Sequence, residues 1–96
     1  MKPSVLLNRY REQVITIALR HCVSDVKVFG SVLHGDDAEG SDLDLLVEPT
    51  SQTTMFDIGG IQFELSELLG IRVDVVTPRG LPESFRAKVL SEARSL

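Results

Sequence analysis

Hydrophobic residues recur along this chain with two different periods. Three stretches repeat apolar residues every three or four positions, which is typical of helices with one buried face. Three shorter stretches are rich in β-branched residues or alternate apolar with polar residues, which is typical of strands. Glycine, proline and polar runs separate these stretches. The pattern predicts helices over residues 3–22, 55–69 and 82–94, and strands over residues 26–29, 42–48 and 71–77.

Local signals mark the helix ends. Ser4 is a candidate N-cap for the first helix, and Thr54 with Asp57 three residues later forms a capping-box pattern. Gly70 is placed to end the middle helix, and Pro82 suits the first position of the last one. The predicted inner faces are Leu6, Tyr10, Val14, Ile17 and Ala18; Met55, Ile58, Ile61, Leu65, Leu68 and Leu69; and Phe85, Val89, Leu90 and Ala93.

Two adjacent glycines, Gly59 and Gly60, interrupt the middle helix and cost about 1 kcal/mol each relative to alanine. Close packing of the helix, a kink, or clearance for a ligand or partner would each explain them. The order of elements is α-β-β-α-β-α. It predicts a single α+β domain over residues 1–96, with a three-stranded mixed sheet covered by helices.

The composition and charge of the chain exclude several classes of function. The chain has 96 residues, a net charge of −4 and one cysteine, Cys22, so no intramolecular disulfide forms. No membrane-spanning run or signal-peptide pattern is present, which favours a cytoplasmic protein. Six of the 14 acidic residues lie between positions 36 and 48. The sequence therefore argues against nucleic-acid binding and predicts that a polyphosphate ligand would arrive with cations.

Candidate chemistry begins where the first two strands are joined. Gly30-Ser31 ends the first strand, where a glycine allows the backbone to approach phosphate and a hydroxyl adds a donor. Asp42 and Asp44 open the second strand at a spacing of two, so both point to one face. Two adjacent carboxylates repel each other unless a cation lies between them. The stretch predicts a divalent metal facing bound phosphates.

Asp74 is the candidate third carboxylate. It lies mid-strand between Val73 and Val75, where an aspartate is costly unless it is paired, exposed or coordinating. If the third strand lies beside the second, Asp74 joins Asp42 and Asp44 on one sheet face. Hard oxygen ligands suit Mg²⁺. Two such ions about 3.5–4 Å apart would stabilise an in-line phosphoryl displacement.

The combined order resembles a known family. Gly30-Ser31, Gly35, Ser41 to Leu45 and Val73 to Val75 match a minimal nucleotidyltransferase of the DNA polymerase β superfamily. Within it, the small size and overall similarity of the chain resemble the antitoxins encoded beside HEPN-domain toxins. The resemblance covers almost the whole chain.

The resemblance implies a mechanism and a partner. Asp42 and Asp44 would hold Mg²⁺ and the triphosphate of ATP, and Gly30 and Ser31 would bind its β- and γ-phosphates. Asp74 would ligate a second Mg²⁺ and help deprotonate the acceptor, a tyrosine hydroxyl of the HEPN-domain toxin. Transfer of AMP would silence that toxin, and the partner would supply the surface that binds the acceptor.

One residue departs from the family pattern. His34 stands where many relatives carry arginine just before the second glycine. Arginine is a fixed cation that contacts phosphate, whereas histidine is mostly neutral at pH 7. We interpret His34 as a surface residue, with weaker phosphate binding as the alternative.

Two other classes of function remain to be weighed. An antitoxin that masks its toxin sterically, with little or no catalysis, would need no carboxylate cluster. A phosphatase with an Asp-x-Asp nucleophile is disfavoured, because Leu45-Leu46 follows Asp44 where that motif requires other residues. An EF-hand is excluded by the missing ligand alternation and terminal glutamate.

Overall fold

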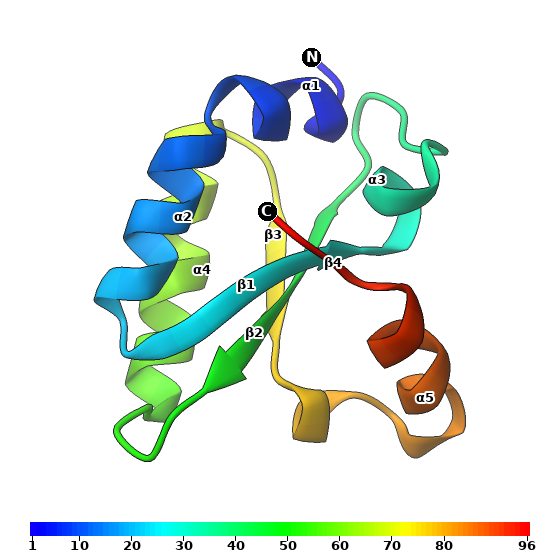
Figure 1. The fold of residues 1–96 in the computed structure, drawn as a ribbon. Coiled ribbons are helices and arrows are strands. Elements are labelled where there is room, and N and C mark those ends of the chain that lie inside the picture. Colours follow the sequence, from blue (N-terminus) through cyan, green and yellow to red (C-terminus); the bar gives the residue numbers. More distant parts are fainter.

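The computed structural model describes all of residues 1–96, and a mixed sheet lies at its centre (Figure 1). Strand β1 (Val23–Phe29) pairs antiparallel with β2 (Leu43–Pro49), and β2 pairs parallel with β3 (Val73–Val76). A fourth strand, β4 (Arg94–Ser95), pairs antiparallel with the other edge of β1, giving the order β3-β2-β1-β4. The mixed sheet is confirmed, whereas the prediction of three strands is wrong.

The fourth strand was missed because it has no pattern of its own. It contains two residues, too few to show alternation, and it exists because Arg94 and Ser95 pair with Val28 and Lys27. The N–H of Leu96 continues the ladder by donating to the Val26 carbonyl at 3.2 Å. The last helix therefore ends at Glu92, two residues earlier than predicted.

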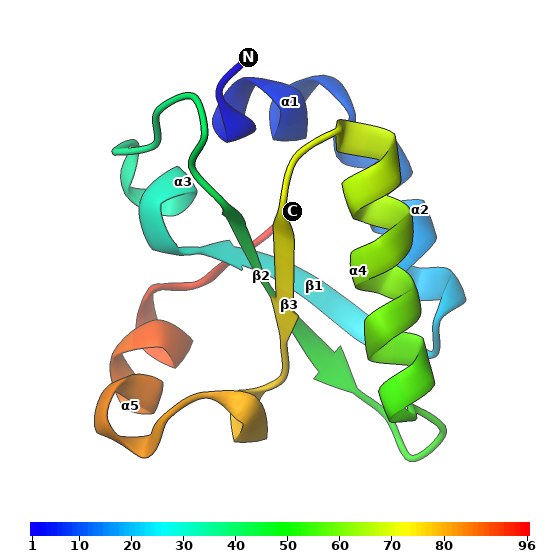
Figure 2. The same ribbon diagram turned by 180° about the vertical axis from the view of Figure 1, so that it is seen from behind.

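The helices lie on both sides of the strands (Figures 1 and 2). Helices α2 (Arg11–Arg20) and α4 (Met55–Leu69) cover one side, and α1 (Pro3–Arg9) lies at one end of the sheet. The short helix α3 (Gly30–His34) and α5 (Glu83–Glu92) lie on the other side, with a 3-10 turn, η1 (Pro78–Gly80), before α5. The observed order is thus longer than the predicted α-β-β-α-β-α.

The core forms between the sheet and the helices α2 and α4. Alternate strand residues point into it and are almost fully buried: Leu43, Leu45, Val47, Val73 and Val75. Val14, Ala18, Ile61, Leu65 and Leu69 meet them from the two helices. Each large aliphatic side chain buried here stabilises the fold by about 1.5–3 kcal/mol. Because side chains alternate along a strand, the residues between these face the opposite side of the sheet.

The first predicted helix is two helices that meet at Tyr10. Tyr10 departs from helical geometry at φ −109° and ψ 21°. The break allows Leu7 of α1 and Val14 of α2 to reach the same core. Ser4 does not cap α1 with its side chain; instead its backbone N–H donates to the Asp37 carboxylate at 2.8 Å.

The predicted ends of α4 are confirmed, but two inner faces are only partly right. Thr54 and Asp57 form the capping box, and Gly70 adopts the left-handed conformation at the C-cap. Met55, however, is 82% exposed. Phe85 and Leu90 of α5 are also exposed, and α5 has no buried residue. Hydrogen bonds hold this helix, since Arg86 Nε donates to the Pro78 carbonyl at 2.9 Å.

Candidate active site

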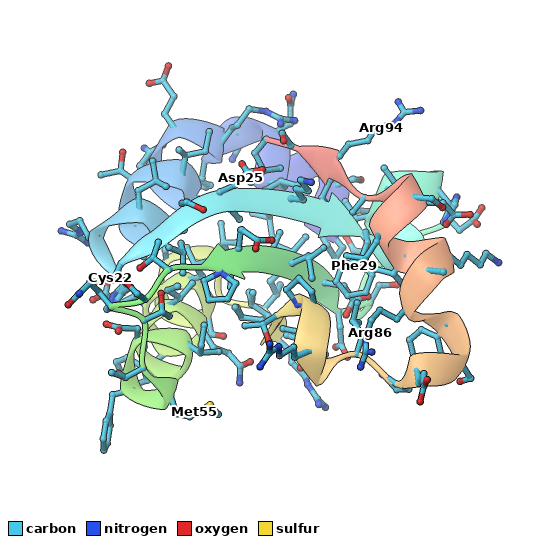
Figure 3. The ribbon with its side chains drawn as sticks, turned by 60° about the horizontal axis from the view of Figure 1, so that its bottom comes forward. Cys22, Asp25, Phe29, Met55, Arg86 and Arg94 are labelled. Carbon is cyan, nitrogen blue, oxygen red and sulfur yellow. The ribbon has the colours of Figure 1, made fainter.

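The end of β1 meets the start of β2 where the predicted glycine turn lies. Phe29 is paired with Asp44 across the two strands, so Gly30 comes directly after that pair. Gly30 adopts φ +74°, and a Cβ at this position would press against the Asp44 carboxylate. Only glycine permits both the left-handed backbone and this close approach. Figure 3 places Phe29 at the same end of the molecule as Arg86, far from Cys22 and Met55.

The parallel pairing of β2 and β3 brings two of the aspartates together. Asp44 and Asp74 occupy the same register position, and both alternate with buried core residues, so both face away from the core. Asp42 lies two residues before Asp44, just outside β2. Partial burial raises the pKa of the Asp44 carboxyl, and the Asp74 and Asp42 carboxylates raise it further. The arrangement therefore concentrates negative charge on one sheet face.

Arg72 supplies the opposing charge. Its Nε atom lies 3.3 Å from Asp74 Oδ1 and 3.7 Å from Asp42 Oδ2. The Arg72 side chain acts against the other causes by lowering the pKa of Asp44. Sequence reasoning did not single this residue out, although its spacing of two from Asp74 places it on the same strand face.

The donor chemistry of the site fits a divalent cation. Three carboxylates contribute hard oxygen atoms, and their mutual repulsion would be relieved by a bound Mg²⁺. As placed, the side chains do not converge as a finished metal centre, because no set of three His, Cys, Asp or Glu residues surrounds one point. Two of the three carboxylates engage Arg72 instead.

The remaining predicted residues lie on or beside α3. Ser31 follows Gly30 in its first turn and is partly exposed, and Gly35 ends the helix at φ +74°. His34 Nε2 lies 3.0 Å from Glu92 Oε2, so the imidazole contacts the end of α5. That contact accounts for His34 within the fold without a ligand.

The loop after α3 is held by a contact that the sequence pattern gave no means to find. Asp37 is almost fully buried, and its carboxylate accepts the Ser4 N–H at the start of α1. This hydrogen bond lowers the pKa of Asp37, outweighing its burial, which raises it. The loop between Gly35 and Asp42 is thus fixed to α1.

The aspartates lie on an open surface. None of the four surface pockets is lined by Asp42, Asp44 or Asp74. The largest, about 530 Å³, lies between α1, α3 and β4. The Asp42 and Asp74 side chains are 41% and 32% exposed, so a large partner as well as a small molecule can reach them.

Fold and site together define a nucleotidyltransferase, and comparison with known proteins agrees. The nucleotidyltransferase domain family matches residues 7–96, and the chain belongs to this family. A protein of Methanocaldococcus jannaschii is 33% identical over 87 residues, which cover 91% of this chain and 94% of the relative. That relative is named as a candidate protein adenylyltransferase.

Solved structures share the architecture. One described as a candidate minimal nucleotidyltransferase is 43% identical, superposes with a TM-score of 0.86, and is matched over 97% of this chain and 95% of that one. A toxin–antitoxin crystal structure with AMP-PNP gives a TM-score of 0.74 at 19% identity. It is matched over 88% of this chain and 69% of that one, and at this identity the likeness concerns the fold alone. The chain is a small α+β nucleotidyltransferase.

Proposed function

We propose that this nucleotidyltransferase transfers AMP from ATP to a tyrosine hydroxyl of a toxin protein and thereby inactivates the toxin. The observation that carries the proposal is the in-register pair Asp44 and Asp74, with Gly30 packed against Asp44. Three carboxylates beside a glycine turn suit the handling of a metal-bound triphosphate. The name of the M. jannaschii relative supports protein as the acceptor.

Each residue has a role in the transfer. The backbone at Gly30 and Ser31, with the Ser31 hydroxyl, donates hydrogen bonds to the β- and γ-phosphates. Asp74 accepts the proton of the acceptor hydroxyl, whose oxygen then forms a bond to the α-phosphorus. The bond from the α-phosphorus to the oxygen that bridges to the β-phosphorus breaks, and pyrophosphate leaves. The toxin keeps AMP in a phosphodiester bond to its tyrosine.

Metal ions belong to this proposal because of the charge at the site. Asp42, Asp44 and Asp74 would hold one or two Mg²⁺ ions, which neutralise the triphosphate and polarise the α-phosphate. The protein itself contributes the fixed position of the carboxylates, since β2 and β3 are paired in register at this point.

A toxin of the HEPN class is the proposed partner. The family resemblance implies it, and the fold is shared with a chain of a toxin–antitoxin crystal structure. The open position of the aspartates, outside any pocket, is compatible with a protein that presents its own hydroxyl group. No helix meets the length and apolar character required to cross a membrane.

The test uses intact mass spectrometry of the proposed toxin partner. The toxin is purified alone and then incubated with the protein, Mg²⁺ and each nucleoside triphosphate in turn. We expect the mass of one or more AMP units with ATP, and no addition with EDTA. Digestion of the modified toxin should place the AMP on tyrosine.

Two variants separate catalysis from masking. Asp42→Asn should abolish transfer while the fold is retained, and Asp36→Asn, in an exposed loop, should transfer normally. A toxin that stays unmodified under every condition, yet is inhibited equally by wild type and Asp42→Asn, would replace the enzymatic proposal with steric masking.

A further inference from the structure

Arg72 is fixed beside the aspartates by the backbone of the sheet. It immediately precedes β3, and its carbonyl accepts the Leu43 N–H at 3.0 Å. Strand alternation then directs its side chain to the face that carries Asp74. The Arg72 side chain is 73% exposed, yet its Nε atom lies 3.3 Å from Asp74 Oδ1 and 3.7 Å from Asp42 Oδ2.

No other side chain provides this contact. The remaining ion pairs of the chain involve the N-terminus, Arg20, His21 and His34, and none reaches the three aspartates. Arg86, the arginine of α5, donates to backbone carbonyls instead. Arg72 is thus the sole cationic partner of the carboxylates within the chain.

A guanidinium and a divalent cation that use the same carboxylate oxygens compete for them. Each lowers the repulsion between the aspartates, and each repels the other through its own positive charge. Asp42 and Asp74 are two of the residues through which Mg²⁺ would be held, and they are the two that Arg72 contacts.

We propose that Arg72 is a built-in counter-cation of the aspartate site, which competes with divalent metal for Asp42 and Asp74 and so sets the metal affinity. The inference rests on the proposed function, because it assumes that the aspartates bind metal. Arg72 is a positioning residue here: it holds the carboxylates and is displaced from them when metal binds. The protein would therefore load metal only at concentrations that overcome this internal ion pair.

The size of the effect follows from the exposure of Arg72. Exposed ion pairs are individually weak, so removing the positive charge should tighten Mn²⁺ or Mg²⁺ binding by only about fivefold, which corresponds to about 1 kcal/mol. Salt screens exposed charges, with a Debye length of about 3 Å at 1 M. The affinity difference between variants should therefore shrink at high salt.

The experiment measures metal binding directly, without catalysis. Mn²⁺ affinity is determined by the EPR signal of free Mn²⁺ for wild type, Arg72→Gln, Arg72→Lys and Arg9→Gln. Arg72→Gln should bind several-fold tighter, and Arg72→Lys, which keeps the charge, should remain near wild type. Arg9→Gln makes the same charge change at an exposed position that has no ion pair, and should bind within about twofold of wild type.

Thermal unfolding in EDTA provides a second readout. Arg72→Gln should unfold at a lower temperature than wild type, because the carboxylates lose their counter-charge, and added Mn²⁺ should raise its Tm by more than that of wild type.

The outcomes distinguish the two levels of the proposal. If wild type binds Mn²⁺ and Arg72→Gln binds it equally or more weakly, the counter-cation role is overturned and the metal site remains. Failure of wild type to bind Mn²⁺ at millimolar concentration, with or without ATP, would overturn the metal-dependent function and this inference with it. An equal gain in Arg9→Gln would reduce the effect to net charge and also overturn the specific role.

Discussion

Asp44 and Asp74 occupy the same register position on two neighbouring parallel strands, and both carboxylates face away from the core. The fold places like charges side by side and partly buries both of them. Because the pKa of Asp44 is raised in the folded protein, its ionised form destabilises the fold above that pKa, and protonation relieves the penalty. The aspartate cluster therefore lowers the stability of the fold in order to place carboxylates where they can act on a substrate.

Asp44→Asn should therefore stabilise the protein while abolishing nucleotidyl transfer. We expect a gain of up to ~1 kcal/mol in the free energy of unfolding at pH 7 without metal, since the site is partly solvent-screened. The gain should vanish below the ordinary Asp pKa of 3.8, where the wild-type carboxyl is also neutral. Urea denaturation in EDTA at pH 7 and pH 3 measures both. The control Asp36→Asn, at an exposed loop position, should change stability little at either pH.

A pair of glycines with equal backbone strain tests the contact between α3 and β2. Gly30 and Gly35 both have φ +74°, but only at Gly30 would a Cβ meet Asp44. Gly35→Ala should cost about 1–2 kcal/mol, the penalty for a left-handed alanine. Gly30→Ala should cost about 1–3 kcal/mol more, because the Asp44 carboxylate must also move. Denaturant unfolding gives both values.

Removal of the Asp44 side chain identifies the source of that excess. In an Asp44→Ala background, Gly30→Ala and Gly35→Ala should cost nearly the same. If the excess persists there, the Asp44 contact is not its cause, and the backbone at Gly30 is constrained by something other than the Asp44 carboxylate.

The site was predictable from the sequence where it depends on strand alternation. Asp42, Asp44 and Asp74 each alternate with apolar residues, so their common face follows once β2 and β3 are neighbours. The order of the motifs resembles a known family, and that resemblance implies that β2 and β3 are neighbours. Arg72 obeys the same alternation but carries no motif, so its contact with Asp42 and Asp74 emerged only from the structure.

Other features depend on contacts between distant parts of the chain. The break at Tyr10 and the pairing of Arg94 with Val28 arise from packing and edge pairing, which leave no local pattern. Periodicity also overestimated burial: Phe85 and Leu90 repeat as an inner face would, yet α5 is held mainly through Arg86. Apolar residues that recur every three or four positions indicate one face of a helix, but only the fold determines whether that face is buried.

The two glycines of α4 have different reasons to be glycine. A Cβ at Gly60 would lie 2.7 Å from His21 Cε1, whereas a Cβ at Gly59 would meet nothing. Gly59→Ala should stabilise the protein by about 1 kcal/mol, the helix propensity difference. The free energy of unfolding of Gly60→Ala should be about 1–3 kcal/mol lower than that of Gly59→Ala, because the His21 imidazole must leave its 3.3 Å contact with Glu64.

A double-mutant cycle with His21 tests this explanation. In a His21→Ala background, Gly60→Ala should stabilise by about as much as Gly59→Ala, since the obstructing ring is gone. Thermal or urea unfolding of the six proteins gives the comparison. A Gly59→Ala variant that unfolds normally but no longer binds the proposed toxin partner would show that Gly59 provides clearance for that partner.

Asp37 links the loop before the aspartates to the N-terminus of α1, and this link should depend on pH. The Ser4 N–H holds the pKa of Asp37 below its ordinary value of 3.8, so the carboxylate stabilises the fold at neutral pH. That contribution is present above pH 3.8 and is lost as the pH falls through the lower pKa that Asp37 has in the folded protein.

Asp37→Asn should therefore lower the Tm at pH 7, and Asp37→Ala, which removes the acceptor entirely, should lower it further. The Tm difference between wild type and Asp37→Asn should narrow as the pH falls below 3.8. Asp36→Asn, one residue away and exposed, should leave the Tm unchanged at neutral pH. A difference between wild type and Asp37→Asn that stays constant from pH 7 to pH 2 would mean that the charge of Asp37 contributes nothing and that its geometry alone fixes the loop.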